Sequence, residues 1–555
     1  MSGTPAISKE NSKEGLELEL EQGVAGTQAT QTIDNGATDD ESLFITGRKL
    51  YLINTSLVVS LFVVQLDSSI ISTSIVDITD NLGGYEKSSW LFTAYLITFC
   101  GLSMIWAKLS DLTGRRMILI ICLGIFTIAS ALCAAAQTID QLIMFRWLQG
   151  AGGGGAYALV QLIFMELVPR RKLPAYMSMV AVALALSLVL GPLLGGGITL
   201  HGSWRWIFII NVPIGIILGL ALWFTLPKAL WNEPAAQTLG KTSLSASLRR
   251  LDILGALLMV ATIVLLTTGL QQAAQGYAWS SSIVLGLIVS TAPAGVAFFT
   301  WQWFATTRRT EPEPVFPWRL CTSRRRMGMI INTFLAGAVQ FVIVAQVPQR
   351  FVTVNDVSPL SAAARLLTFG AMIPIGSVIG SAFMGGKLRI APCYIVLAGA
   401  IIELIGVALL SQISTTPEID GTQYGFQVVA GLGTGMINAA LIILTPYLME
   451  KRDLAVGTAA NMQFRVLGGL IGLAIVVSVS TPYVRSRLTD LVSPEQVLLI
   501  LERTETIKEL PVDTARQVRT LFGESYNLQI KVMIGFAAAK LPITALMWTN
   551  QKSDV

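Results

Sequence analysis

Residues 107–117 read AKLSDLTGRRM and separate two apolar runs, at 88–107 and 117–136. Each run is about 20 residues long, the length that a helix needs to cross the hydrocarbon core of a bilayer. Gly114 permits a tight turn between them, so the two helices are expected to lie antiparallel. The stretch therefore predicts a pair of membrane-spanning helices joined by a short polar turn.

The composition of the whole chain agrees with a membrane protein. Of its 555 residues, 53% are hydrophobic and only 13% are charged, and the mean hydropathy is +0.63. Soluble proteins carry about 25% charged residues, so the composition excludes a disordered chain, a coiled coil and a soluble enzyme. The net charge of +5 comes from short basic clusters between apolar runs. That distribution is typical of membrane topology and not of a nucleic-acid-binding surface.

The chain contains fourteen apolar runs long enough to span a bilayer. These runs are continuous, as in membrane helices, whereas barrel strands alternate apolar and polar residues. We therefore predict an all-α polytopic membrane protein with fourteen spans arranged 6 + 2 + 6. Equal six-span halves are typical of transporters built from repeats. The runs lie at 50–75, 88–107, 117–136, 141–165, 174–200, 206–226, 252–271, 283–305, 328–349, 359–384, 392–411, 425–448, 457–480 and 528–549.

Basic residues orient these spans. With the N-terminus in the cytosol, the short outer loops carry only Lys87, Arg205 and Arg350, so both termini are predicted to be cytosolic. The predicted parts are a disordered cytosolic tail (1–49), a first six-helix half (50–226), cytosolic loops with two linker helices (227–327), a second half (328–549) with a long outer loop (481–527), and a cytosolic tail (550–555). In the outer loop, Ser493-Pro494-Glu495-Gln496 predicts a capped helix start.

The fourth span contains an arginine in the stretch LIMFRWLQGAGGG, residues 142–154. Burying Arg146 in an apolar helix costs on the order of 2.5–3.5 kcal/mol, and the small residues that follow it let another backbone approach closely. Asp67 in the first span lies at a similar depth. A buried carboxylate next to an arginine is able to alternate between a protonated and an ion-paired state. A purely structural bridge and a snorkelling Arg146 remain alternatives.

Several segments resemble the major facilitator superfamily, and together they cover spans one to six. Residues 107–117 resemble its loop between the second and third helices, with Ala107 in place of a glycine, and residues 142–154 match its fourth-helix motif. Residues 66–72 and 204–215 resemble first-helix and sixth-helix motifs of its fourteen-span drug:proton antiporters. Residues 187–197 resemble a motif of the antiporter branch that its symporters mostly lack. The chain looks like fungal antiporters of the toxin and multidrug efflux type.

The resemblance implies proton-coupled efflux of small hydrophobic compounds, such as a toxin, a secondary metabolite or a drug, by alternating access between the halves. It implies roles for three groups of residues. These are proton coupling by Asp67 and Arg146, a gating loop of Asp111, Gly114, Arg115 and Arg116, and an antiporter bend at Gly191, Pro192 and Gly195. The basic turn at Arg115 and Arg116 also has a simpler interpretation as a topology anchor.

Polar residues within other spans are candidates for a substrate cavity between the halves, with interhelical hydrogen bonding as the alternative. The candidates are Gln149, Asn332, Gln340, Asn438 and Arg465. Glu403 and Lys540 also fall near the middle of their spans, where a structural pair is favoured over a transport role.

Proton-coupled uptake of a nutrient or iron chelate is the main alternative function, and the Gly191-Pro192 pair argues against it. The single histidine, His201, and five cysteines without metal spacing predict no metal site and no enzyme, and no phosphate-binding loop is present. We expect no cofactor, a proton gradient as the energy source, a monomer in the bilayer, and the plasma membrane as location, with the vacuolar membrane as the alternative.

Overall fold

The computed structural model of this chain describes ten stretches of residues between Gly47 and Trp548. The described residues are 47–71, 74–83, 88–168, 173–227, 252–274, 277–308, 314–385, 390–450, 453–502 and 504–548, and they form helices, turns and loops without a strand. Most of the tail predicted at 1–49, most of the loop predicted at 227–251 and all of the tail predicted at 550–555 lie outside these residues.

The first set of long helices occupies each of the first six predicted spans. Its members are α2 (Arg48–Ile70), α4 (Ser88–Thr113), α5 (Arg115–Ala135), α6 (Ile139–Leu167), α7 (Leu173–His201) and the continuous pair α8 (Trp206–Ile209) and α9 (Asn211–Thr225). Gly114 forms the turn between α4 and α5 with φ +103°, a conformation that side-chain-bearing residues avoid. The tight turn predicted from the sequence is thereby confirmed.

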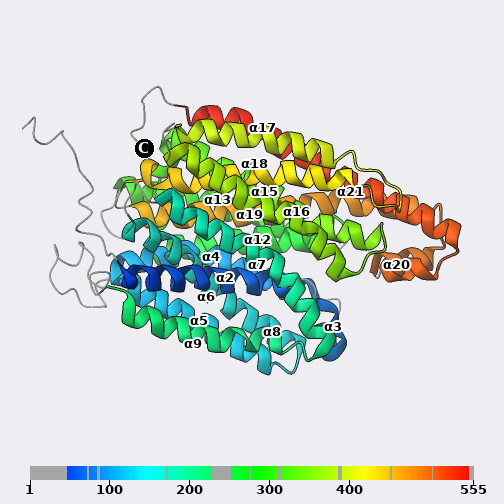
Figure 1. Ribbon diagram of the computed structural model, residues 1–555, viewed down its shortest axis with the longest axis horizontal. Coiled ribbons are helices and arrows are strands. Elements are labelled where there is room, and N and C mark those ends of the chain that lie inside the picture. Colours follow the sequence, from blue (N-terminus) through cyan, green and yellow to red (C-terminus); the bar gives the residue numbers. More distant parts are fainter. Residues whose placement is uncertain are drawn as a thin grey trace, which may run out of the picture. The chain divides into compact units, whose positions relative to one another are not determined.

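The linker and the second set follow in the predicted order. The helices are α12 (Ile253–Ala274), α13 (Ser282–Arg308), the short α14 (Arg319–Thr322), α15 (Arg324–Thr353), α16 (Pro359–Gly385), α17 (Pro392–Leu410), α18 (Thr422–Leu448), α19 (Leu454–Leu488), α20 (Pro494–Glu502) and α21 (Val512–Leu546). Figure 1 shows the blue to green helices of the first set beside the light-green to red helices of the second. The linker helix α12 packs against α4 of the first set and α19 of the second.

Twelve helices in the described part of the chain have the length and hydropathy to cross a membrane. The helices α6 and α7, each 29 residues long, stand at the two other predicted spans. At 1.5 Å per residue each is roughly 43 Å long, which exceeds the bilayer core. The α6 sequence carries Arg146, Gln149 and a run of four glycines, which lower its hydropathy.

Asp252 holds the two linker helices together at the start of α12. Its carboxylate accepts hydrogen bonds from the Gly255 backbone N–H (2.8 Å), the Trp301 indole (2.6 Å) and the Gln302 amide (2.8 Å). The first bond caps the N-terminus of α12, and the other two come from α13. A single buried acid therefore sets how the linker pair packs.

The predicted end of the first span was wrong by five residues. The helix α2 ends at Ile70 instead of residue 75, and a separate helix, α3 (Ile75–Leu82), follows. The hydroxyls of Ser68 and Ser69 donate to the carbonyls of Gln65 and Leu66. Such local side-chain bonds compete with helix continuation.

The segment predicted as a long outer loop, 481–527, is largely helical. The helices α19 and α21 extend into it and are joined by α20 and a 3₁₀ helix, η6 (Thr504–Glu509). Its helix start is capped as predicted, since the Gln496 side chain accepts from the Ser493 N–H (3.2 Å) and the Ser493 hydroxyl from the Gln496 N–H (3.4 Å). The segment has an apolar core of its own, formed by Val484, Leu488, Val497, Ile500, Ile507, Val518 and Leu521.

Asp356, between α15 and α16, connects this outer segment to the second set. Its carboxylate contacts Lys508 (3.3 Å) and Arg519 (3.1 Å). Partial burial opposes its ionisation, but the hydrogen bonds and positive charges of Arg519 and Lys508 outweigh that effect and lower the pKa of Asp356. Asp356 itself adopts a positive φ of 54°, which aspartate tolerates better than most residues.

Glycines let α6 approach its neighbours. A Cβ added at Gly154 would lie 2.2 Å from the Phe99 carbonyl oxygen on α4, whereas one added at Gly124 on α5 would meet nothing within 4 Å. We expect Gly154→Ala to lower the thermal midpoint of the detergent-solubilised protein, because the α4–α6 contact has no room for a methyl group.

Gly124→Ala is the matched control. It should leave the midpoint unchanged or raise it, because alanine is favoured over glycine in a helix by about 1 kcal/mol. Equal midpoints for the two variants, followed by size-exclusion fluorescence during a thermal ramp, would contradict the close packing at Gly154.

Candidate functional site

The Asp67 carboxylate on α2 is the centre of a buried polar network. It accepts three hydrogen bonds, from the Arg146 guanidinium on α6 (2.5 Å), the Gln149 amide on α6 (2.8 Å) and the Asn211 amide on α9 (2.8 Å). Only 1% of Asp67 and none of Arg146 is exposed. Asp67 and Arg146, predicted at similar depth, therefore form an ion pair that is closed to solvent.

Gln149 extends the network to α5. Its amide nitrogen also donates to the Ser130 hydroxyl (2.8 Å), and its oxygen accepts from Arg146 (2.7 Å). Both hydrogen-bonding ends of the glutamine are thus occupied, which fixes its orientation. Gln149, a candidate for the substrate cavity, therefore contacts both members of the Asp67–Arg146 pair.

Two residues of α4 also contact Arg146. Its Nε donates to the Leu91 carbonyl on α4 (3.2 Å), and its guanidinium lies 4.2 Å from the ring centroid of Tyr95. This cation–π contact and the hydrogen bonds offset the cost of burying the charge. Its Nη2 is buried without a hydrogen-bond partner among the described residues, so the site carries one unused donor.

Asn211 is a member of this site that the sequence reasoning missed. Residues 204–215 were singled out as a motif, but no role was predicted for the asparagine. A usable signal was present, because Asn211 is a polar residue that begins an otherwise apolar helix, NVPIGIILGLALWFT. Polar residues in such helices are rare and tend to find partners within the bundle.

The segment 187–197 on α7 packs directly beside the network. The Ser69 hydroxyl, two residues beyond Asp67, donates to the Ser187 carbonyl (2.9 Å). A Cβ at Gly191 would lie 2.0 Å from the Ser69 oxygen, so only glycine fits there. The Gly195 carbonyl accepts from the Thr199 hydroxyl (3.0 Å). The helix α7 continues through Pro192 without interruption.

The residues of the predicted gating loop contact helices of their own set. Arg115 pairs with Asp111 and with Glu166 at the end of α6 (3.0 Å), and it donates to the Ser110 hydroxyl (2.8 Å). Arg116 donates to the carbonyls of Leu226 (3.1 Å) and Trp223 after and within α9. The loop therefore ties together the ends of α4, α5, α6 and α9.

The other cavity candidates do not form one cluster. Asn332 on α15 is buried and bonds to the Gly328 carbonyl (2.9 Å) and the Thr544 hydroxyl on α21 (3.3 Å). The Asn438 amide on α18 donates to Gln340 on α15 (3.0 Å). The Asn332–Thr544 and Asn438–Gln340 bonds are interhelical, the alternative stated above, and the Asn332–Gly328 bond lies within α15. Arg465 on α19 lies near enough to Tyr157 on α6 to interact with it electrostatically.

Glu403 on α17 and Lys540 on α21 form a buried salt bridge, as predicted. The carboxylate also accepts from the Thr434 hydroxyl on α18 (2.9 Å). Neither charged side chain is exposed. The pair joins three helices of the second set.

The two sets of helices touch near the end predicted to be cytosolic. The Ser103 hydroxyl on α4 lies 3.4 Å from the Gln463 side chain on α19, and the Thr458 hydroxyl on α19 lies 3.5 Å from the Met165 sulfur on α6. At the same interface α7 packs against α16 and α18. Movement of one set against the other must break or slide these contacts.

In the part of the chain that the structure describes, two packed sets of six long helices are joined by two linker helices, and a charged network is buried in the first set. This is the architecture of an integral membrane transporter. The sequence profile of the Major Facilitator Superfamily matches residues 57–473, and the chain belongs to that superfamily.

Proteins with similar sequences belong to the same class of membrane transporter. The chain is 33% identical over 519 residues to the MFS-type transporter FPY5 of Fusarium mangiferae, covering 93% of this chain and 87% of that protein. It is 28% identical over 464 residues to the MFS-type efflux pump MFS1 of Trichophyton rubrum, covering 83% and 84%. A bacterial homologue of the lysosomal transporter Spinster, solved in an inward-facing conformation, shares the fold, with a TM-score of 0.58, 12% identity and coverage of 91% and 100%.

The Asp67–Arg146 contact leads to a stability prediction. Removing one partner of a buried ion pair costs about 3–5 kcal/mol, because the other charge is left unpaired. We expect Arg146→Gln to lower the thermal midpoint in detergent sharply, and Asp67→Asn/Arg146→Gln to recover part of the loss, since no lone charge remains. A double variant no more stable than Arg146→Gln would show that the two residues are not coupled.

Proposed function

We propose that the protein exports small hydrophobic compounds in exchange for protons. The observation that carries this proposal is the Asp67 carboxylate. It is buried, accepts hydrogen bonds from three side chains, and lies two residues from the α2–α7 contact at Ser69. The relatives named as efflux pumps support the direction of transport, and the motif at 187–197 agrees with it.

The coupling step follows from the hydrogen bonds of Asp67. A proton added to the carboxylate removes its negative charge and turns one oxygen into a donor. Arg146, Gln149 and Asn211 all donate to this group, so protonation weakens three bonds at once. The bonds that α2 makes with α6 and α9 are thereby loosened, and the first set of helices gains freedom to change its packing.

Transmission to the second set would use α7. This helix contacts α2 through Ser69 and Gly191, and it also packs against α16 and α18. A shift of α2 that follows protonation would therefore reach the interface between the sets. Rocking of the two sets around that interface would open the substrate path alternately to each side of the membrane.

The proposal treats Asp67 as the proton carrier, so we expect Asp67→Asn to abolish gradient-driven export while the protein still reaches the membrane. The measurement is efflux of a panel of fluorescent hydrophobic compounds from drug-sensitive cells, with and without a protonophore. Wild-type export should collapse when the protonophore is added.

The matched control is Asp77→Asn, which alters an exposed acid on α3 and should export normally. Normal export by Asp67→Asn would refute the role of Asp67. Gradient-dependent accumulation of the compounds, in place of their loss, would show uptake and contradict the proposed direction.

A further inference from the structure

The two sets of helices repeat one packing pattern, in which α18 is the counterpart of α6. Residues 145–154 read FRWLQGAGGG and residues 426–435 read FQVVAGLGTG, with phenylalanine and three glycines in the same register. The glycines make equivalent contacts. Added Cβ atoms would lie 2.2 Å from the backbone oxygens of Tyr95 (Gly150) and Phe99 (Gly154), and 2.5 and 2.0 Å from those of Phe369 (Gly431) and Ile373 (Gly435).

This register places Gln427 where the first set has Arg146. By chain order, α15, α17 and α21 correspond to α2, α5 and α9, the helices that surround the Asp67 network. The counterpart of that network should therefore lie between α15, α17, α18 and α21. A small cavity occupies this region, lined by Gln346 and Arg350 on α15, Gln423 and Gln427 on α18, Tyr526 on α21 and apolar side chains such as Ile413.

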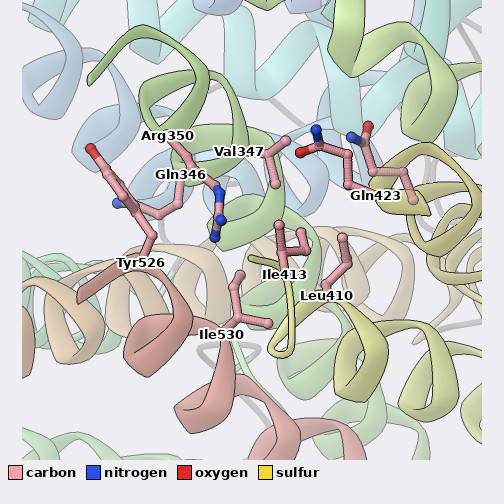
Figure 2. Close-up of a pocket in the computed structure, with 9 residues that line it drawn as sticks. Gln346, Val347, Arg350, Leu410, Ile413, Gln423, Tyr526 and Ile530 are labelled. Carbon is pink, nitrogen blue, oxygen red and sulfur yellow. The ribbon is translucent and has the colours of Figure 1, made fainter. Parts of the chain in front are cut away.

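The cavity contains a buried cation. Arg350 is 5% exposed, and Figure 2 shows its side chain extending from α15 toward Ile413 and Ile530. Its guanidinium donates to two neutral acceptors, the Asn527 side chain (2.5 Å) and the Ser414 carbonyl (2.6 Å). Among the residues that the structure describes, no carboxylate pairs with it. Arg146 in the first set has Asp67, and Arg350 lacks such a counterion.

Gln427 supplies an unused donor at the same cavity. It is fully buried, its oxygen accepts from the Thr368 hydroxyl (2.7 Å), and its amide nitrogen has no partner within the described part of the chain. The Thr368 hydroxyl has a single proton and also lies 2.8 Å from the Arg365 carbonyl. When that proton is donated to Gln427, the amide nitrogen is the end left for a ligand in the cavity. Buried donors without acceptors are rare in folded proteins.

We propose that this cavity binds a small inorganic anion, for which chloride is the probe. Arg350 supplies the positive charge and the Gln427 amide a hydrogen bond, as the carboxylate of Asp67 is bound by Arg146 and an amide in the first set. The free space amounts to about 10 Å³, which is room for roughly one water-sized particle. A space of that size excludes an organic anion, and chloride, which is somewhat larger than water, would fill it completely.

The anion would stabilise the outer ends of four helices of the second set. Arg350 lies at the end of α15 that the sequence predicts to face the outer side of the membrane, so chloride on that side would be the source. The proposal does not depend on proton coupling or on the direction of transport, and its failure would leave the proposed function untouched.

The test uses the full-length protein in detergent, with sodium chloride replacing sodium gluconate at constant ionic strength. A ligand that binds only the folded state raises stability with its concentration, so the thermal midpoint of the wild type should rise and saturate. Arg350→Gln should abolish the chloride response. Gln427→Leu, which keeps the buried cation, should raise the half-saturating chloride concentration by about tenfold, a loss of one weak interaction.

Arg365→Gln is the matched control. Arg365 lies on α16 and donates to the Tyr424 hydroxyl without lining the cavity, so this variant should respond as the wild type does. A wild type whose midpoint is the same in chloride and gluconate would overturn the proposal and leave water as the occupant. An unchanged chloride response in Gln427→Leu would overturn it as well, whether or not Arg350→Gln folds.

Discussion

A charged arginine within an apolar helix is the constraint on which the packing of the first six helices depends. Arg146 needs an anion, acceptors for its N–H groups and a shield from lipid, and these come from α2 and α4. Asp67 on α2 supplies the charge, Leu91 on α4 a carbonyl, and Tyr95 on α4 an aromatic face. Gln149 and Asn211 both donate to the other oxygen of the acid, Oδ1. The polar network thus specifies which helices are neighbours, something that apolar contacts in lipid do poorly.

Much of this architecture could be predicted from the sequence, because lipid leaves the chain few options. The spans, the turn at Gly114 and the capped start at Ser493 each follow from a local rule, and the structure agrees with them. The Asp67–Arg146 pair was also predictable, since two opposite charges at one depth in apolar helices have few other partners.

The remaining features depend on contacts between distant segments, which the sequence does not display. Asn211 joins the site because α9 packs against α2 beside Asp67. No spacing rule connects residues 144 positions apart in the sequence. The polar candidates Asn332 and Asn438 face other helices of their own set. Likewise, α19 and α21 continue past the membrane because an apolar core around Leu488 and Val518 forms between them and α20.

The two buried ion pairs reach the interface between the sets through different helices. Glu403 and Lys540 join α17 to α21, and these helices pack against members of their own set. Asp67 lies on α2, which packs against α7, and α7 in turn packs against α16 and α18 of the second set. Glu403 also accepts from Thr434 on α18, so a change in charge there would reach the same interface through α18. Asp67 differs in its donors, because Arg146, Gln149 and Asn211 on two other helices all donate to it, and this arrangement makes the carboxylate suited to couple proton binding to the exposure of a substrate site.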